Sequence, residues 1–127
     1  MSESPQWYVV RSKPRREEYA QDQLLRRGVE TFLPRILEAG GPRLEPTVGP
    51  LFPGYLFARV DLLNQYNSVI WAPGVRSFVT FGEVPAAVDP DVVDFLRERC
   101  GREGVVRVVR TFQDGDVVRI VRGPLGG

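Results

Sequence analysis

Few residues of this 127-residue chain have side chains suited to catalysis. Histidine, the commonest general base, is absent from the sequence. The single cysteine, Cys100, stands next to Arg99 and Arg102, whose positive charge can lower a thiol pKa, but a lone cysteine without a partner base is usually structural. Three carboxylates stand where a helix is predicted to begin: Asp89, Asp91 and Asp94. Acidic residues at this end of a helix complement its dipole. We therefore expect that the protein is not an enzyme and that it binds neither a metal ion nor a cofactor.

The stretch Pro50–Asp61 carries the strongest pattern in the chain. Its two prolines restrict the backbone, and Gly54 then opens a strand. Successive side chains of a strand alternate between its faces. Leu56, Ala58 and Val60 share one face, and Tyr55, Phe57 and Arg59 share the other. The small aliphatic face suits packing under helices. Aromatic rings left on the other face predict a recognition surface, unless a second layer of structure covers them as ordinary core.

Length and composition indicate one globular domain. The 43% hydrophobic content is sufficient for a core, and 17 basic against 16 acidic residues give a net charge of only +1. Any contact with a nucleic acid must therefore come from a local basic patch. No apolar run reaches the roughly 20 residues of a membrane span. The polar start is not a signal peptide, and a single cysteine fits a reducing compartment. We expect a soluble cytoplasmic protein with no membrane contact.

The positions of apolar residues, glycines and prolines predict seven main elements. Strands are expected at 6–11, 29–33, 55–60 and 75–81, and helices from Ser12 to about Arg27, over 62–71 and over 90–100. The segment 35–49, rich in Gly and Pro, reads as a loop or a loose hairpin. This order predicts an α+β fold: a mainly antiparallel four-stranded sheet, related to a split βαβ unit, with the strand 55–60 central and the helices packed on one face.

A basic cluster marks the entrance of the first predicted helix: Arg11, Lys13, Arg15 and Arg16. Basic side chains at that end oppose the helix dipole, so helix stability does not account for them. They form either an exposed polar face or a contact surface for phosphate groups, and the sequence leaves both interpretations open.

Several segments resemble the N-terminal domain of NusG-type transcription elongation factors. They are Trp7-Tyr8, Leu51–Phe57, Ala72–Val75 and Phe78–Gly82. Residues 115–126 look like the opening of the KOW domain that follows in that family. The resemblance covers nearly the whole chain in order. Leu51-Phe52 before Pro53, and the turn Val79–Gly82, look closer to the specialised RfaH-like paralogues than to housekeeping NusG.

The resemblance implies a non-catalytic factor that binds bacterial RNA polymerase and suppresses pausing or termination. Members of the family dock an apolar cavity of the sheet onto the clamp helices of the polymerase β′ subunit. The matching positions in this chain are Tyr8, Phe52, Pro53, Tyr55, Phe57 and Phe81. The resemblance also implies that the helix after the central strand contacts the gate loop of the β subunit, through Tyr66, Asn67 and Ser68. RfaH-like proteins carry a histidine and threonines at that site, which this chain lacks.

The resemblance also implies a contact with non-template DNA in the elongation complex. Lys13, Arg15 and Arg16 are the main candidates, and Gln23 and Arg76 are further ones. The segment 35–49 departs from the family, because Gly40-Gly41-Pro42 stands where relatives place basic and aromatic residues.

The implied domains are an NGN-like polymerase-binding domain over 1–104, a linker over 105–112 and the truncated start of a KOW domain over 113–127. The β-branched residues of 105–111 can also add an edge strand. One KOW strand cannot close a barrel, so we expect 112–127 to be disordered or loosely docked. Partners of the KOW domain, ribosomal protein S10 and Rho, are accordingly expected only for a longer chain, and this chain is expected to be a monomer.

The alternative function is that of a sheet-surface module for single-stranded RNA. The run Gly54–Val60 approaches the aromatic strand motif of RNA-recognition sheets, whose rings stack on bases. Pro53 stands where that motif has a basic residue. The two functions differ in what Tyr55 and Phe57 contact: a protein helix or nucleic-acid bases.

Overall fold

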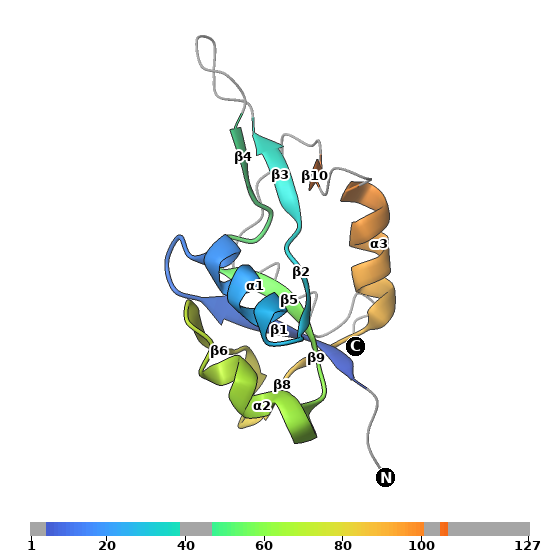
Figure 1. Ribbon diagram of the computed structural model, residues 1–127. Coiled ribbons are helices and arrows are strands. Elements are labelled where there is room, and N and C mark those ends of the chain that lie inside the picture. Colours follow the sequence, from blue (N-terminus) through green and yellow to red (C-terminus); the bar gives the residue numbers. More distant parts are fainter. Residues whose placement is uncertain (1–4, 39–46, 101–104, 107–127) are drawn as a thin grey trace.

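The structure is a computed structural model that describes residues 5–38, 47–100 and 105–106 (Figure 1). Its elements are β1 (Gln6–Ser12), α1 (Glu17–Arg26), β2 (Glu30–Phe32), β3 (Arg35–Glu38), β4 (Thr47–Pro50), β5 (Tyr55–Val60), α2 (Leu62–Ile70), β6 (Val75–Phe78), β7 (Thr80–Phe81), β8 (Val84–Pro85), β9 (Ala87–Val88), α3 (Pro90–Cys100) and β10 (Val105–Val106). The predicted α+β class is confirmed.

The main sheet is antiparallel and has the strand order β2-β5-β1-β6. The longest ladder joins β1 to β5, from Gln6 opposite Val60 to Arg11 opposite Tyr55. The strand β5 lies between β2 and β1, so its predicted central position is confirmed. The short strand β9 pairs with the first half of β1 and makes this a five-stranded sheet rather than the four-stranded one expected. A strand of two residues is too short to show a period-two pattern in the sequence.

The helices α1 and α2 cover one face of the main sheet. Val10, Leu56 and Val60 on the strands pack with Leu24 of α1 and Val69 of α2 in one buried cluster. This is the small aliphatic face that the alternation of β5 predicted. Both helices are amphipathic, and burying their apolar stripes against the sheet supplies most of their stability.

The third helix, α3, lies on the opposite face, which differs from the expected packing of all helices on one side (Figure 1). Val93 and Leu96 of α3 form a second buried cluster with Trp7, Val9 and Phe57 of the strands. Both faces of β1 and β5 carry large apolar side chains, so each face needs its own cover. The pattern of one strand does not say which helix supplies that cover.

Element boundaries follow the capping residues in α2 and α3. Asp61 accepts a hydrogen bond from the Leu63 N–H at 3.1 Å, and Asp89 accepts one from the Asp91 N–H at 2.9 Å. In contrast, α1 begins at Glu17, later than expected, and its N-cap Arg16 makes no side-chain capping bond. Ser12, the expected cap, ends β1 and donates its hydroxyl to the Lys13 carbonyl.

The segments around the main sheet also differ in detail from their predictions. The segment 35–49 is a true hairpin of β3 and β4, whose tip at 39–46 lies outside the described residues. The predicted strand 75–81 is interrupted after Phe78, and β7 then pairs with β8 in a separate hairpin. The strand β10 pairs in parallel with β3, as the β-branched residues permitted. The remaining predictions for the linker and the KOW start, at 107–127, lie outside the described residues.

The close packing around the turn at Gly74 predicts that a larger residue at this position destabilises the fold. Gly74 has φ +86°, and a Cβ at this position would lie 2.8 Å from Cδ2 of Tyr19 and 3.2 Å from the backbone nitrogen of Ala20. We expect Gly74→Ala to lower the free energy of unfolding by about 2 kcal/mol or more, from backbone strain and overpacking together. Urea denaturation measures the change.

Gly28→Ala is the matched control for this substitution. Gly28 has φ +79°, but no atom lies within 4 Å of the position that a Cβ would occupy there. Gly28→Ala should therefore lower the free energy of unfolding by about 1 kcal/mol, from backbone strain alone. Equal decreases in stability in the two variants would contradict the close packing of the Gly74 turn on α1.

Candidate functional site

The aromatic side of β5 is covered rather than exposed. The Phe57 ring is only 2% exposed, stacked on Phe32 with the ring centres 5.9 Å apart and met edge-on by Phe52 at 6.2 Å. The expectation that Phe57 lies on an open recognition surface is therefore wrong. The alternative interpretation, that a second layer covers the ring, is confirmed for this residue.

Electrostatic and ring contacts hold α3 over this face. The guanidinium of Arg97 lies 5.0 Å from the ring centre of Trp7 and 5.4 Å from that of Phe32. The same guanidinium pairs with Glu30 at 3.0 Å, and Glu30 also lies 3.5 Å from Arg59. Cations over aromatic faces add to apolar packing. The covering helix is thus tied to β1, to β2 and to the edge of the sheet.

Tyr8, expected beside Phe57, lies on the other face of the sheet. Its ring is buried in the cluster under α1 and α2 and meets Phe78 edge-on, with ring centres 5.8 Å apart. The reason is the alternation of β1, where Tyr8 shares a face with Val10 and Trp7 shares one with Val9. The structure therefore does not bring Tyr8 together with Phe52 and Phe57 on one surface.

The remaining candidates for this surface are Pro53 and Tyr55, at the end of the sheet where β5 begins, and Phe81, on β7 beyond β6. Pro53 is exposed, Tyr55 is half-buried with the Arg11 guanidinium 5.9 Å from its ring centre, and Phe81 is 40% exposed. We call Tyr55 and Phe81, together with the apolar Pro53 near Tyr55, the aromatic rim. These three side chains keep accessible surface, whereas the other residues predicted for the same contact, Tyr8, Phe52 and Phe57, are buried.

The three candidates on α2 stay near the surface. Tyr66 stacks on Phe78 with ring centres 5.5 Å apart and is 42% exposed. Asn67 is exposed and Ser68 is half-buried. All three lie on the short helix α2.

The basic candidates form a turn between β1 and α1 rather than the first turn of a helix. Lys13, Arg15 and Arg16 are all exposed, and we call residues 13–16 the basic turn. The helix itself opens with Glu17 and Glu18, which suit its dipole. The basic side chains therefore do not oppose the dipole from inside the helix, and they remain available to an external anion.

The backbone of the basic turn is tied down and strained. The Lys13 N–H donates to the Gly74 carbonyl at 2.8 Å, and the Arg16 N–H donates to the Lys13 carbonyl at 3.0 Å. Arg15 has φ 59°, the left-handed region that a bulky residue rarely adopts. Of the other DNA candidates, Arg76 is exposed on β6, close to this turn through the pairing of Ser12 with Val75, whereas Gln23 is half-buried on α1.

Glu17 is a buried residue that sequence reasoning missed. Its side chain accepts a hydrogen bond from the Gly54 N–H at 2.8 Å, although 37 positions separate the two residues. Gly54 has φ +87° and its carbonyl accepts from the Ser12 N–H at 2.9 Å. A glutamate in the first turn of a helix is ordinary in sequence, so no local signal distinguishes this one.

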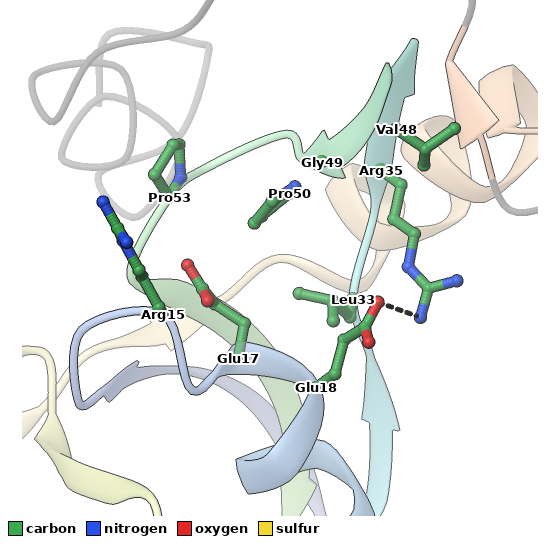
Figure 2. Close-up of a pocket in the computed structure, with 9 residues that line it drawn as sticks. All are labelled: Arg15, Glu17, Glu18, Leu33, Arg35, Val48, Gly49, Pro50 and Pro53. Carbon is green, nitrogen blue, oxygen red and sulfur yellow. Dashed lines mark ion pairs between the residues drawn. The ribbon is translucent and has the colours of Figure 1, made fainter.

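A pocket opens between the basic turn, the start of α1 and the β3–β4 hairpin (Figure 2). Its volume is about 370 Å³, and we call it the hairpin pocket. Its lining consists of Arg15, Glu17, Glu18, Leu33, Arg35, Val48, Gly49, Pro50 and Pro53. Only Arg15 and Pro53 of this set were predicted as site residues. The others come from three separate segments, which the fold alone brings together.

Cys100 has no features of a reactive thiol. It is 4% exposed at the end of α3, and burial raises the pKa of its thiol, although a hydrogen bond with the Arg35 backbone opposes the shift. The neighbouring arginines, which could have lowered the Cys100 pKa, do not do so: the largest effect is burial, which disfavours the thiolate and fits the structural role that the sequence favoured.

The raised Cys100 pKa predicts a pH-dependent stability. The unfolded chain ionises its thiol near pH 8.5, whereas the folded chain keeps it protonated to higher pH. The contribution of Cys100 should therefore be complete below about pH 8.5 and decline as the pH rises toward the folded pKa. The difference in unfolding free energy between the chain and its Cys100→Ala variant, measured from about pH 7 to about pH 10, should fall over that range. A difference that grows with pH would contradict the buried neutral thiol.

Neither a metal site nor a membrane span is found among the described residues. No group of three or more metal-ligating side chains lies together in the parts of the chain that the structure describes. None of the three described helices is long and apolar enough to cross a membrane.

These observations define an α+β domain with a basic turn and a mixed-charge pocket at the end of its main sheet where β5 begins, and with partly exposed rim residues there and on β7. The family model described as transcription termination factor nusG matches residues 5–97. The chain belongs to the NusG family.

Individual relatives agree with this assignment. The transcription termination/antitermination protein NusG of Thermus thermophilus is 31% identical over 143 aligned residues, which cover 95% of this chain and 77% of that protein. The NusG of Helicobacter pylori is 29% identical over 79 residues, 58% of this chain and 43% of that protein. The chain thus spans less than half of the Helicobacter relative. These relatives do not test the predicted closeness to RfaH-like paralogues, which stays a prediction.

The fold also matches a solved structure. A structure of Thermotoga maritima NusG, solved to describe its domain interaction, superposes on this chain with a TM-score of 0.50 and 23% sequence identity. The match covers 72% of this chain and 55% of that chain. This likeness supports the α+β fold described above.

Proposed function

We propose that this chain is a transcription termination/antitermination factor that binds bacterial RNA polymerase and suppresses pausing or termination. The observation that carries the proposal is the family match over residues 5–97, which spans both the aromatic rim and the basic turn. The Thermus and Helicobacter relatives are themselves termination/antitermination proteins. The role is one of binding, not of catalysis.

In this proposal the aromatic rim docks on the β′ clamp helices. Pro53 and Tyr55 offer apolar surface at the start of the central strand β5, and Phe81 offers it on the β7–β8 hairpin, where a partner helix can bury it. Phe52 and Phe57 support the rim from beneath, because both rings are buried and meet edge-on. Tyr66, Asn67 and Ser68 on α2 are proposed to contact the β subunit, and Tyr8 to stabilise the fold rather than to touch the polymerase.

The alternative of a sheet-surface RNA-binding module loses its main support. That function needs neighbouring rings whose faces are open to bases. The Phe57 ring is 2% exposed and already stacked on Phe32. Tyr55 alone does not form such a platform.

Substitutions in the rim and beneath it should affect polymerase binding and folding separately. We expect the double variant Tyr55→Ala/Phe81→Ala to stay folded and to bind purified core polymerase at least about tenfold more weakly, since interface aromatics are typical hot spots. Phe57→Ala should instead lower the free energy of unfolding by about 3 kcal/mol or more, because it empties a buried ring site. Pull-down with core polymerase and urea denaturation measure the two effects.

Phe95→Ala is the control for the removal of an aromatic side chain from the surface. Phe95 is 53% exposed on α3 and stacks with Arg99 outside the rim. Its removal should leave polymerase binding unchanged. If the rim double variant binds as tightly as this control, the assignment of the rim to the polymerase is wrong.

The basic turn is proposed to contact phosphates of the non-template strand in the elongation complex. Lys13, Arg15 and Arg16 are exposed together on a turn whose backbone is fixed by Gly74. Arg76 lies near them on β6, so it is a further contact, and Gln23 is the most enclosed of the set.

Phosphate contacts predict a change in salt dependence. Each phosphate contact that a substitution removes should reduce the slope of log affinity against log salt by about one. On assembled elongation complexes we expect Lys13→Ala/Arg16→Ala to reduce the slope by about two and Arg26→Ala to leave it unchanged. Arg26 is a suitable control because it pairs with Asp22 at 2.8 Å on the last turn of α1. An unchanged slope in the double variant would exclude phosphate contact by the basic turn.

A further inference from the structure

Glu17 carries a buried carboxylate whose burial the helix α1 does not explain. Among the described residues, the buried polar ones are Ser12 and Glu17, and Glu17 is 8% exposed. Burying a carboxylate costs free energy unless hydrogen bonds compensate for the lost water. Glu18 stands in the same first turn and complements the helix dipole equally well, yet its side chain is 75% exposed. The start of the helix therefore needs no buried acid, and the burial of Glu17 serves another contact.

That contact lies in the turn before β5. The side chain of Glu17 points from the start of α1 toward Pro53 (Figure 2), and it accepts a hydrogen bond from the Gly54 N–H at 2.8 Å. No ion pair engages Glu17 within the part of the chain that the structure describes. The backbone N–H of Gly54 is thus the group that this carboxylate is placed to hold.

The turn from Phe52 to Tyr55 could adopt either of two backbone conformers. The Tyr55 N–H donates to the Phe52 carbonyl at 3.0 Å, and Gly54 at the third position has φ +87°, as in a type II turn. A type I turn needs a negative φ at that position, which glycine adopts as readily. Pro53 suits the second position of both types. The two conformers differ in the direction of the peptide group between Pro53 and Gly54.

The carboxylate of Glu17 discriminates between these two conformers. In the observed one, the Gly54 N–H meets the carboxylate. A flip of the peptide group would turn the Pro53 carbonyl toward Glu17 instead, because the N–H and the C=O of a trans peptide point in opposite directions. The flipped conformer would place two oxygens against each other and lose a hydrogen bond to a charged acceptor, which is the stronger class. Glu17 therefore stabilises the type II turn.

We propose that Glu17 is a positioning residue for the polymerase contact: it holds the turn 52–55 in the conformer that the partner helix meets. The inference rests on the proposed docking of the aromatic rim, because Pro53 and Tyr55 belong both to the rim and to this turn. Ordering a segment during binding lowers affinity, so a turn that is fixed beforehand binds more tightly. In this role Glu17 acts through the backbone of the turn and does not itself touch the polymerase.

NMR of the free chain tests whether Glu17 holds the turn. In a type II turn the Gly54 N–H lies close to the Pro53 Hα, and in a type I turn it points away, so the nuclear Overhauser effect between these protons reports the conformer. In Glu17→Ala we expect this signal to fall to about half or less of its wild-type intensity, as the second conformer becomes populated. Glu17→Gln should retain the signal, because its amide oxygen can still accept from the Gly54 N–H. A signal that is unchanged in Glu17→Ala would overturn the proposal.

Affinity for purified core polymerase tests the consequence for binding. We expect Glu17→Ala to bind at least about threefold more weakly, because only chains in the fitting conformer can dock. Glu17→Gln should bind like the wild type. Urea denaturation of each variant gives the folded fraction, so that the affinities refer to folded protein. Equal losses in both variants would assign the effect to the charge of Glu17, and wild-type affinity in Glu17→Ala would remove the positioning role; either result overturns the proposal.

Gly54→Ala changes the same conformational equilibrium by a different route. Alanine disfavours φ +87° and so favours the flipped peptide, although no atom lies within 4 Å of the position of its Cβ. The double variant Glu17→Ala/Gly54→Ala should bind no more weakly than Gly54→Ala alone, because both substitutions release the same peptide group. Gly28→Ala is the matched control: it has φ +79° and no close atom, at the other end of α1, and should bind like the wild type. Additive losses in the double variant would overturn the proposal.

Failure of this inference is distinguishable from failure of the proposed function. If the wild-type chain binds core polymerase and the Glu17 variants bind equally well, only the positioning role of Glu17 is wrong. If the wild-type chain does not bind core polymerase, the proposed function is wrong, and the role of the turn in docking is wrong with it.

Discussion

The arrangement of the candidate sites depends on the backbone of Gly54. Its N–H donates to the buried Glu17 side chain at 2.8 Å, and its carbonyl accepts from the Ser12 N–H at 2.9 Å. These two bonds join the start of β5 to the start of α1 and to the end of β1. Hydrogen bonds to charged groups are stronger than neutral ones, and φ +87° requires glycine at this position. Pro53 and Tyr55 of the rim are thereby held next to the basic turn.

A second constraint is that the central sheet is apolar on both faces. The ladder between β1 and β5 places Val10 and Leu56 toward α1 and α2, and Val9 and Phe57 toward α3. A chain of 127 residues buries a limited fraction of its surface and gains from covering both faces. Consequently no broad sheet face is left open for recognition among the described residues. The binding surfaces proposed above accordingly lie at the ends of strands, on the basic turn and on α2.

Local patterns in the sequence were sufficient for most elements of the fold. Asp89 before an apolar stripe predicted the start of α3, and the alternation of 55–60 predicted β5 and its helix-covered face. The start of α1 was misplaced, because Ser12 resembles a cap, whereas Arg15 in the left-handed region keeps residues 13–16 outside the helix. Propensity does not encode that strain.

The candidate site was less predictable, since its residues meet only through tertiary contacts. Exposure of Phe57 was inferred from one strand, but its cover comes from Val93 and Leu96, which lie far later in the chain. Tyr8 was assigned through the resemblance, and the alternation of β1 places it on the opposite face. Glu17 and Arg35 belong to no sequence motif that would mark them as site residues. The exposed basic residues were identified correctly as a cluster because they are adjacent or nearly so in sequence.

The position of the acids relative to the basic residues leaves the basic turn open to the nucleic acid proposed as its ligand. Glu17 and Glu18 occupy the first turn of α1 and complement its dipole, and each already has a partner within the fold. The charges of Lys13, Arg15 and Arg16 are therefore not consumed by the helix. Because the Lys13 N–H is fixed to the Gly74 carbonyl, the turn is held in place before any ligand binds. Binding an anion there costs less ordering entropy than it would on a loop that is not tied down. Since the Gly54 bonds hold Pro53 and Tyr55 next to the same turn, the proposed docking of these residues on a protein partner would also set the orientation in which the basic side chains meet the proposed DNA strand.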